Sequence, residues 1–129
     1  MSDVEEAGSI VVVDPDPNSR NNAEDLEDEF DRQVIAMDSV DFDTEASEDV
    51  LDAAVFVICW DLGIRSAADL LEEIRHNPRL QDKKVIVATA RPTREMVRWA
   101  VTLGADTVCT LPYDPDSIRQ HIEALERAA

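Results

Sequence analysis

Five short apolar stretches recur along the chain, and polar sequence long enough for a helix separates each from the next. The stretches span residues 9–14, 33–37, 54–60, 84–89 and 107–111. The first, third and fourth are continuously apolar and rich in valine and isoleucine, a pattern typical of strands buried on both faces of a parallel sheet. The hydrophobic pattern therefore predicts five strands in one sheet.

Helical patterns follow these strands, and each begins at or near a residue that can cap a helix. Side chains that accept hydrogen bonds from the free N–H groups of a helix start are present in every interval. The predicted caps are Asp16 before Pro17, Thr44 with Ser47 as a second candidate, Ser66, Thr93 and Asp114. Five strand–helix repeats in 129 residues predict an α/β domain, a doubly wound five-stranded parallel sheet with five helices. We expect this domain to span residues 9–129, after a flexible acidic tail at residues 1–8.

The net charge of −17 is concentrated in the first half of the chain. Residues 1–64 hold 19 acidic and 2 basic side chains, whereas residues 65–129 hold 10 of each. Such acidity argues against direct nucleic-acid binding, because phosphates would be repelled. The basic residues are 10 arginines and only 2 lysines. This composition favours a protein adapted to a salt-rich, haloarchaeal-type cytoplasm, where dense carboxylates keep the surface hydrated; an ordinary acidic protein is the alternative.

Nothing in the chain indicates export or a membrane. No stretch approaches 18 consecutive apolar residues, and the sequence MSDVEEAG at the N-terminus lacks the pattern of a signal peptide. We therefore expect a cytoplasmic protein that does not contact a membrane.

The residues that follow the strands are the candidates for chemistry, because ligands of such sheets bind at the carboxyl ends of the strands. They are Asp14, Pro15 and Asp16; Cys59, Trp60 and Asp61; Thr89, Ala90 and Arg91; and Leu111, Pro112 and Tyr113.

The residues at these four strand ends, with their flanking sequences, resemble the receiver domain of bacterial and archaeal response regulators. The stretches that carry the resemblance are IVVVDPDPNSR, VICWDLG with ADLLEEIR, VIVATARPTREMVRWAVTLGAD and LPYDPDSI, which occur in the family's order between Ile10 and about Leu125. The resemblance implies the flavodoxin-like receiver fold and a role in two-component, phosphorelay signal transduction. It also implies a signalling module rather than an enzyme.

The family's chemistry needs five groups, of which this chain matches two. Two carboxylates after the first strand help to hold Mg²⁺, an aspartate ending the third strand accepts the phosphoryl group, and a hydroxyl and a lysine after the last two strands hold its oxygens. Asp14 and Thr89 match the first carboxylate and the hydroxyl. Pro15, Cys59 and Leu111 stand at the other three positions. The resemblance therefore implies a degenerate pseudo-receiver that needs no cofactor.

Two alternatives remain for this degenerate pocket. In the first alternative, Asp61 is a displaced phospho-acceptor and Asp14 and Asp16 are weak Mg²⁺ ligands. The competing interpretation of Asp16 is that it caps the following helix. Cys59 is a redox switch in the second. The missing lysine and second carboxylate count against the first. No basic residue is predicted beside Cys59 to lower its pKa, which favours inert packing of the thiol.

The helix over residues 93–103 is the candidate partner surface. Its apolar stripe is formed by Met96, Val97, Ala100 and Val101, and three residues lie off that stripe: Arg94, Arg98 and Trp99. An exposed tryptophan beside arginine is typical of a binding hot spot, although Trp99 folded against a neighbouring loop is the alternative.

The resemblance implies that partners or a second copy bind this helix together with strand 107–111 and helix 115–127. Tyr113 and Arg119 are expected on or near the same face.

The charge distribution predicts that salt stabilises the fold. Self-repulsion among the carboxylates of residues 1–64 destabilises the compact state in dilute buffer, and salt screens that repulsion. We expect the melting temperature, followed by circular dichroism, to rise markedly as salt is raised into the molar range. A melting temperature that stays flat over that range would rule out adaptation to salt.

Overall fold

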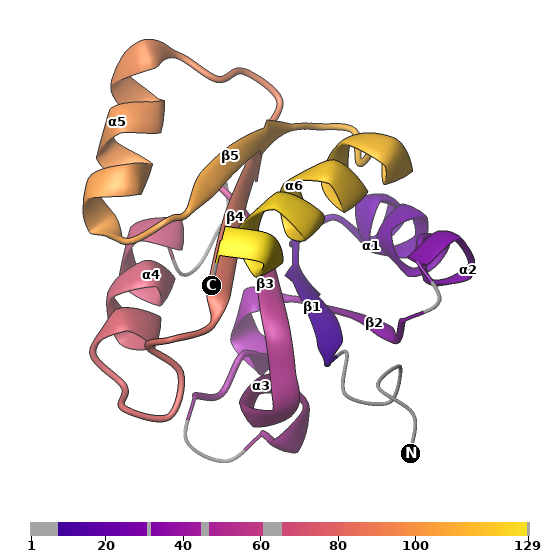
Figure 1. Cartoon of the computed structure of the whole chain (residues 1–129), viewed down its shortest axis with the longest axis horizontal. Coiled ribbons are helices and arrows are strands. Elements are labelled where there is room, and N and C mark those ends of the chain that lie inside the picture. Colours follow the sequence, from indigo (N-terminus) through magenta and orange to yellow (C-terminus); the bar gives the residue numbers. More distant parts are fainter. Residues whose placement is uncertain (1–7, 31, 45–46, 61–65, 129) are drawn as a thin grey trace.

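The computed structural model describes residues 8–30, 32–44, 47–60 and 66–128, which form one parallel sheet between two layers of helices (Figure 1). The strands are β1 (Ser9–Val13), β2 (Val34–Met37), β3 (Ala53–Cys59), β4 (Lys84–Thr89) and β5 (Thr107–Thr110). Their order across the sheet is β2-β1-β3-β4-β5, and every neighbouring pair is parallel. The predicted doubly wound five-stranded α/β fold is confirmed.

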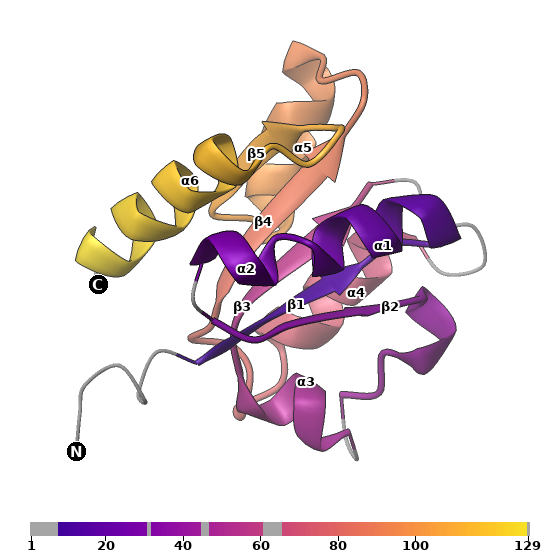
Figure 2. The same cartoon turned by 90° about the vertical axis from the view of Figure 1, so that its right-hand side faces the viewer.

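Helices cover both faces of the sheet (Figures 1 and 2). One face carries α1 (Pro17–Glu24), α2 (Glu27–Phe30) and α6 (Pro115–Ala128). The other carries α3 (Glu48–Asp52), α4 (Ala67–Arg75) and α5 (Arg94–Leu103), and the short 3₁₀ helix η2 (Ser39–Asp41) follows β2. Within the residues that the structure describes, every helix is too short or too polar to cross a lipid bilayer.

Two separate hydrophobic clusters result from the alternation of side chains along the strands. In β1, Val11 and Val13 belong to the cluster under α3, α4 and α5, whereas Ile10 and Val12 belong to the cluster under α1 and α6. All four side chains are almost completely buried. This two-sided burial is the physical reason why the strand sequence is continuously apolar rather than alternating.

Most helix starts lie where the capping residues predict. Asp16, Ser66 and Thr93 each accept a hydrogen bond from a backbone N–H of the first helical turn, and Asp114 accepts one from Ser117. Gly104 ends α5 with a positive φ of 122°. The first candidate for α3, Thr44, is not its cap: Ser47 accepts from Val50 and occupies that position.

Two local predictions differ from the structure. The sequence between Pro17 and Phe30 forms α1 and α2 rather than one helix, because the chain turns at Asp25 and buries Leu26 on the sheet. Val101 was predicted in the apolar stripe of α5 but is 50% exposed. The predicted tail lies outside the described residues, except for Gly8, which precedes β1.

At the amino ends of β4 and β5, one arginine connects three backbone segments. The Arg75 guanidinium donates to the carbonyl oxygens of Gly104 (2.6 Å), Gln81 (2.7 Å) and Lys83 (2.8 Å). It also pairs with the Asp106 carboxylate at 3.0 Å, and Asp106 in turn accepts from the Val85 N–H at 2.8 Å. Arg75 therefore fixes the loops on either side of β4 to the end of α4.

Replacing Arg75 should destabilise the fold much more than replacing a nearby surface arginine. Arg75→Ala leaves several backbone carbonyls without their charged donor, so we expect a loss of about 2–4 kcal/mol in the free energy of unfolding. Arg79→Ala is the matched control, because Arg79 is exposed and should change stability by less than about 0.5 kcal/mol. Chemical denaturation measures both. Equal, small effects would show that the Arg75 contacts contribute little.

Candidate functional site

The carboxyl end of the sheet holds several of the residues that the sequence singles out. Asp14, Cys59 and Thr89 directly follow or end β1, β3 and β4, and Tyr113 lies in the loop between β5 and α6. Their exposed fractions are 2% for Asp14, 7% for Cys59, 6% for Thr89 and 8% for Tyr113. These four side chains are therefore almost completely buried.

Asp14 is the centre of this cluster, and both of its carboxylate oxygens are occupied by the chain itself. The Tyr113 hydroxyl donates to Oδ2 at 2.6 Å, and the Asp16 backbone N–H donates to Oδ1 at 2.9 Å. The Asp14 carbonyl oxygen accepts from the Arg20 guanidinium at 2.8 Å. A short hydrogen bond from a hydroxyl to a carboxylate belongs to the stronger class of protein hydrogen bonds. Asp14 is thus held as a structural acceptor.

Tyr113 points inward, which corrects the prediction that it belongs to a partner surface. Its ring packs in the cluster under α1 and α6, and its hydroxyl reaches Asp14. Burial raises the pKa of Tyr113, and the hydrogen bond to Asp14 and the charge of that carboxylate raise it further. The phenol is therefore kept protonated, in the form that can donate to Asp14.

The positions that the resemblance matches to the phosphoryl-binding groups hold uncharged, largely buried side chains. Cys59 is buried in the core cluster under α4 and α5. Leu111, at the lysine position, packs against both core clusters and supplies no positive charge. Thr89 accepts from the Arg91 N–H at 3.3 Å. Asp61 lies outside the described residues.

The residues present do not fit a Mg²⁺ ion, which the receiver fold would otherwise suggest. Each carboxylate oxygen of Asp14 already accepts a hydrogen bond from the chain, and Pro15 has no oxygen in its side chain. Asp16 is turned to α1, where its oxygens accept from the Asn18 N–H at 3.1 Å and the Ser19 hydroxyl at 3.3 Å. In the described part of the chain, no group of three or more His, Cys, Asp or Glu residues is arranged to hold a metal ion.

The second cysteine, Cys109, is also buried. Cys109 lies in β5, in the cluster that contains Tyr113. Burial raises the pKa of its thiol to about 11. Since the thiolate is the reactive form, Cys109 is an inert core residue at neutral pH.

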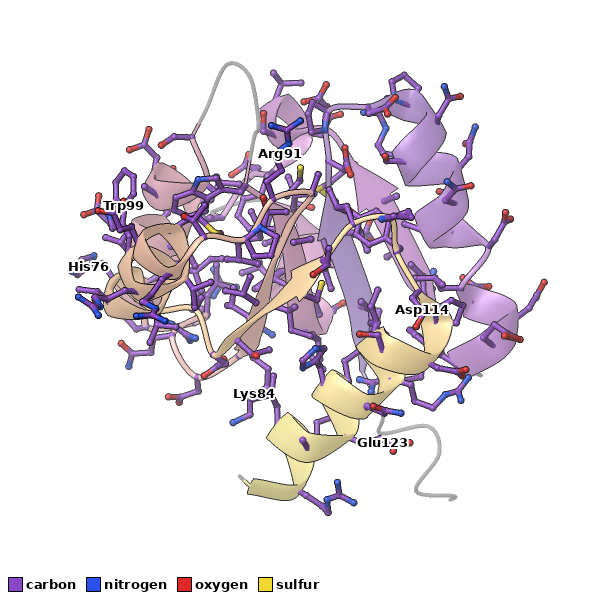
Figure 3. All side chains as sticks on the ribbon, turned by 90° about the horizontal axis from the view of Figure 1, so that it is seen from above. His76, Lys84, Arg91, Trp99, Asp114 and Glu123 are labelled. Carbon is purple, nitrogen blue, oxygen red and sulfur yellow. The ribbon has the colours of Figure 1, made fainter. Side chains whose placement is uncertain are left out.

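The five residues predicted to bind a partner do not share one face. Arg94 and Arg98 are exposed on α5, and Trp99 is 55% exposed there. Arg119 instead lies beside α2, with its guanidinium 5.7 Å from the centre of the Phe30 ring. Figure 3 shows Trp99 on the side of α5 that faces away from α6. Because Tyr113 is buried, the residues of the predicted face lie in two separate places: on α5, and where Arg119 of α6 lies beside α2.

The sequence analysis missed the partner of Trp99, which is Trp60. The two rings meet edge to face, with centroids 5.3 Å apart and planes at 78°. Trp60 directly follows β3, and its backbone N–H donates to the Ala88 carbonyl oxygen at 2.8 Å. These are the two tryptophans of the chain, but neither periodicity nor spacing indicates that they touch.

Comparison with known proteins identifies the fold. No protein-family model and no curated protein sequence matches the chain. The structure is similar to the BeF₃-activated receiver domain of DrrB, with a TM-score of 0.76 and 23% identity over 93% of this chain and 97% of that one. A CheY-like receiver domain from Methanospirillum hungatei matches with a TM-score of 0.73 and 16% identity over 91% of both chains.

Two further structural neighbours are a longer response regulator and a receiver domain solved as a dimer. The response regulator DrrB, an OmpR/PhoB homologue from Thermotoga maritima, matches with a TM-score of 0.76 and 25% identity over 94% of this chain. This chain spans 54% of that regulator. The beryllofluoride-activated NtrC4 receiver domain, solved as a dimer, matches with a TM-score of 0.74 and 17% identity over 90% of this chain and 93% of that one. The chain therefore has the fold of response regulator receiver domains.

The buried phenol predicts a distinctive alkaline titration, which is easy to follow because Tyr113 is the only tyrosine. Tyrosinate absorbance should stay low in the folded protein above pH ~10, the ordinary pKa of tyrosine, and should appear near pH ~10 in denaturant. Because the folded pKa lies above the unfolded one, the stability that Tyr113 contributes is fully present below pH ~10 and declines as the pH rises further. Tyrosinate forming in the folded protein near pH ~10 would contradict the burial.

Tyr113→Phe isolates the hydrogen bond from the packing of the ring. It leaves one oxygen of the buried Asp14 without its donor, so we expect the free energy of unfolding at neutral pH to fall by about 1–3 kcal/mol. Denaturant unfolding measures the change. An unchanged stability would mean that the bond is not a structural constraint.

Proposed function

We propose that this chain is a receiver-like domain of a two-component-type signalling system that acts by binding a protein partner, without phosphorylation of its own. One observation carries the proposal: the only matched pocket carboxylate, Asp14, is closed by the Tyr113 hydroxyl and the Asp16 N–H. The acid-rich composition supports the further proposal that the domain works in a salt-rich cytoplasm.

Few groups in this pocket remain to bind a cation. A cation on the Asp14 oxygen that accepts from Tyr113 would compete with this buried hydrogen bond, whose loss costs about 1–3 kcal/mol. The second carboxylate position is Pro15, so the ion would gain no further ligand there. A phosphoryl group would also bring a charge of about −1.5 to −2, opposite Leu111 instead of a lysine.

An interaction role is consistent with the fold, because receiver domains can act by assembly. The similar NtrC4 receiver domain forms a dimer in its beryllofluoride-activated state. In this chain, the exposed part of α5 supplies the residue types that dominate protein interfaces, tryptophan and arginine. A domain that has lost the phosphoryl chemistry can retain such a surface and present it constitutively.

Incubation with Mg²⁺ and a small phosphodonor should leave the intact mass of the protein unchanged, because three of the five groups needed are absent and Asp14 is occupied. Mass spectrometry measures the outcome, and a receiver domain with a complete acidic pocket, treated in parallel, serves as the positive control. An added phosphate that maps to Asp61 would overturn the proposal and support the displaced acceptor.

A further inference from the structure

A small cleft lies between α2 and α6, which cover the same face of the sheet (Figures 1 and 2). Its floor is apolar and consists of Ile10 on β1, Phe30 at the end of α2 and Ile122 on α6. Ile10 and Ile122 are almost completely buried. Ile10 is the second residue of β1 and Asp14 directly follows the last, so this cleft and the Asp14 pocket lie at opposite ends of that strand. We call it the α2–α6 cleft; its volume is about 200 Å³.

Four charged side chains also line the α2–α6 cleft, and their charges cancel. They are Arg32, Arg119, Glu123 and Glu126. Arg32 and Glu126 neutralise each other through two hydrogen bonds of 3.1 Å, and the Arg32 Nε donates to the Gly8 carbonyl oxygen at 2.9 Å. This pair is engaged within the protein, which leaves Arg119 and Glu123 as the charges that a ligand can reach.

Arg119 and Glu123 lie one turn apart on α6, where Figure 3 labels Glu123. The Arg119 guanidinium lies 5.7 Å from the centre of the Phe30 ring. Its hydrogen bonds to the Asp116 carboxylate and the Glu29 carbonyl oxygen are both 3.3 Å long, beyond the usual range for N–H···O bonds. A guanidinium has five N–H donors, so Arg119 keeps donors for a further acceptor. Glu123 is exposed, and its carboxylate has no hydrogen bond or ion pair with the described part of the chain.

From this arrangement we propose that the α2–α6 cleft binds a free α-amino acid with an aliphatic side chain, such as leucine. The ligand's carboxylate pairs with the Arg119 guanidinium and its ammonium group with the Glu123 carboxylate, while its side chain packs on the apolar floor. Residues one turn apart on a helix have Cβ atoms about 5–6 Å apart, which brings their charged groups within reach of the two charges on one α-carbon. The inference goes beyond the proposed function and does not depend on it.

Other classes of ligand fit the cleft less well. A cavity of about 150 Å³ holds benzene, whereas sites for drug-sized ligands occupy about 300–1,000 Å³. A volume of about 200 Å³ therefore suits a small aliphatic side chain. A lone anion would meet the free Glu123 carboxylate, and a lone cation would meet the Arg119 guanidinium. A leucine inside a peptide chain carries neither of the two charges that these side chains recognise.

Titration of the full chain with L-leucine, followed by nuclear magnetic resonance, tests the inference. We expect the amide resonances of α2, of the start of β1 and of the middle of α6 to shift. The dissociation constant should be on the order of 1 mM, as expected for a ligand of about nine non-hydrogen atoms. Glycine should bind at least about tenfold more weakly, because it buries no apolar side chain. Absence of shifts in this region at about twenty times that concentration, or equal binding of glycine, overturns the inference.

Two analogues remove one charge of leucine at a time. 4-Methylpentanoate is leucine without its ammonium group, and 3-methylbutylamine is leucine without its carboxylate. Each should bind about two- to fivefold more weakly than leucine at low salt, the range of an exposed ion pair, and the difference should shrink as salt rises. N-acetyl-leucine N-methylamide represents a leucine within a peptide chain. If it binds as tightly as leucine, the occupant is a protein segment and the inference is overturned.

Variants assign each ligand charge to its partner. Glu123→Gln should weaken binding of leucine about two- to fivefold but should not weaken binding of 4-methylpentanoate, which has no ammonium group to lose its partner. Arg119→Gln should likewise weaken leucine but not 3-methylbutylamine. A folding defect, in contrast, would weaken all three ligands alike, and thermal unfolding of each variant detects it independently.

Glu95→Gln and Arg98→Gln are the matched controls, because they make the same chemical changes at exposed positions of α5. Both should leave binding of leucine unchanged. Equal binding of leucine by Glu123→Gln and Glu95→Gln would overturn the inference. The proposed function is tested separately by phosphorylation of the chain, since a protein that binds no leucine can still act without accepting a phosphoryl group.

Discussion

The hydrogen bond between Tyr113 and Asp14 joins side chains 99 positions apart and fixes the carboxyl end of the sheet. It satisfies a carboxylate that is almost completely buried, and it holds the loop between β5 and α6 against β1. The same bond engages one of the two Asp14 oxygens that a cation could use. The packing that stabilises this end of the domain is therefore also the packing that closes its pocket.

The sequence was sufficient to predict the elements, because their patterns are local. Continuous apolar runs identify strands such as β1, and caps such as Thr93 identify helix starts. The exceptions are positions where tertiary packing overrides the local sequence pattern. Leu26 is buried by a turn that interrupts the first helix, and Val101 remains exposed because α5 contacts the sheet mainly through its other side.

The candidate site was predictable in its membership but not in its geometry. Matching to the receiver pattern identified Asp14 and Cys59 as pocket residues, and both are buried at the carboxyl end of the sheet. The direction of Tyr113 was not predictable, because a loop residue has no periodicity to indicate its orientation. The pairing of Trp60 with Trp99 depends on how far α5 lies from β3, which is set by the core beneath them and not by spacing along the chain.

The short outer strands restrict how this domain can associate. β2 and β5 form the two edges of the sheet, and each has only four residues. A sheet edge with free N–H and C=O groups is a template on which an extended chain can add a strand, and short edges limit that mode of binding. Strand addition at either edge is therefore disfavoured, which protects a concentrated protein from indiscriminate sheet-to-sheet aggregation.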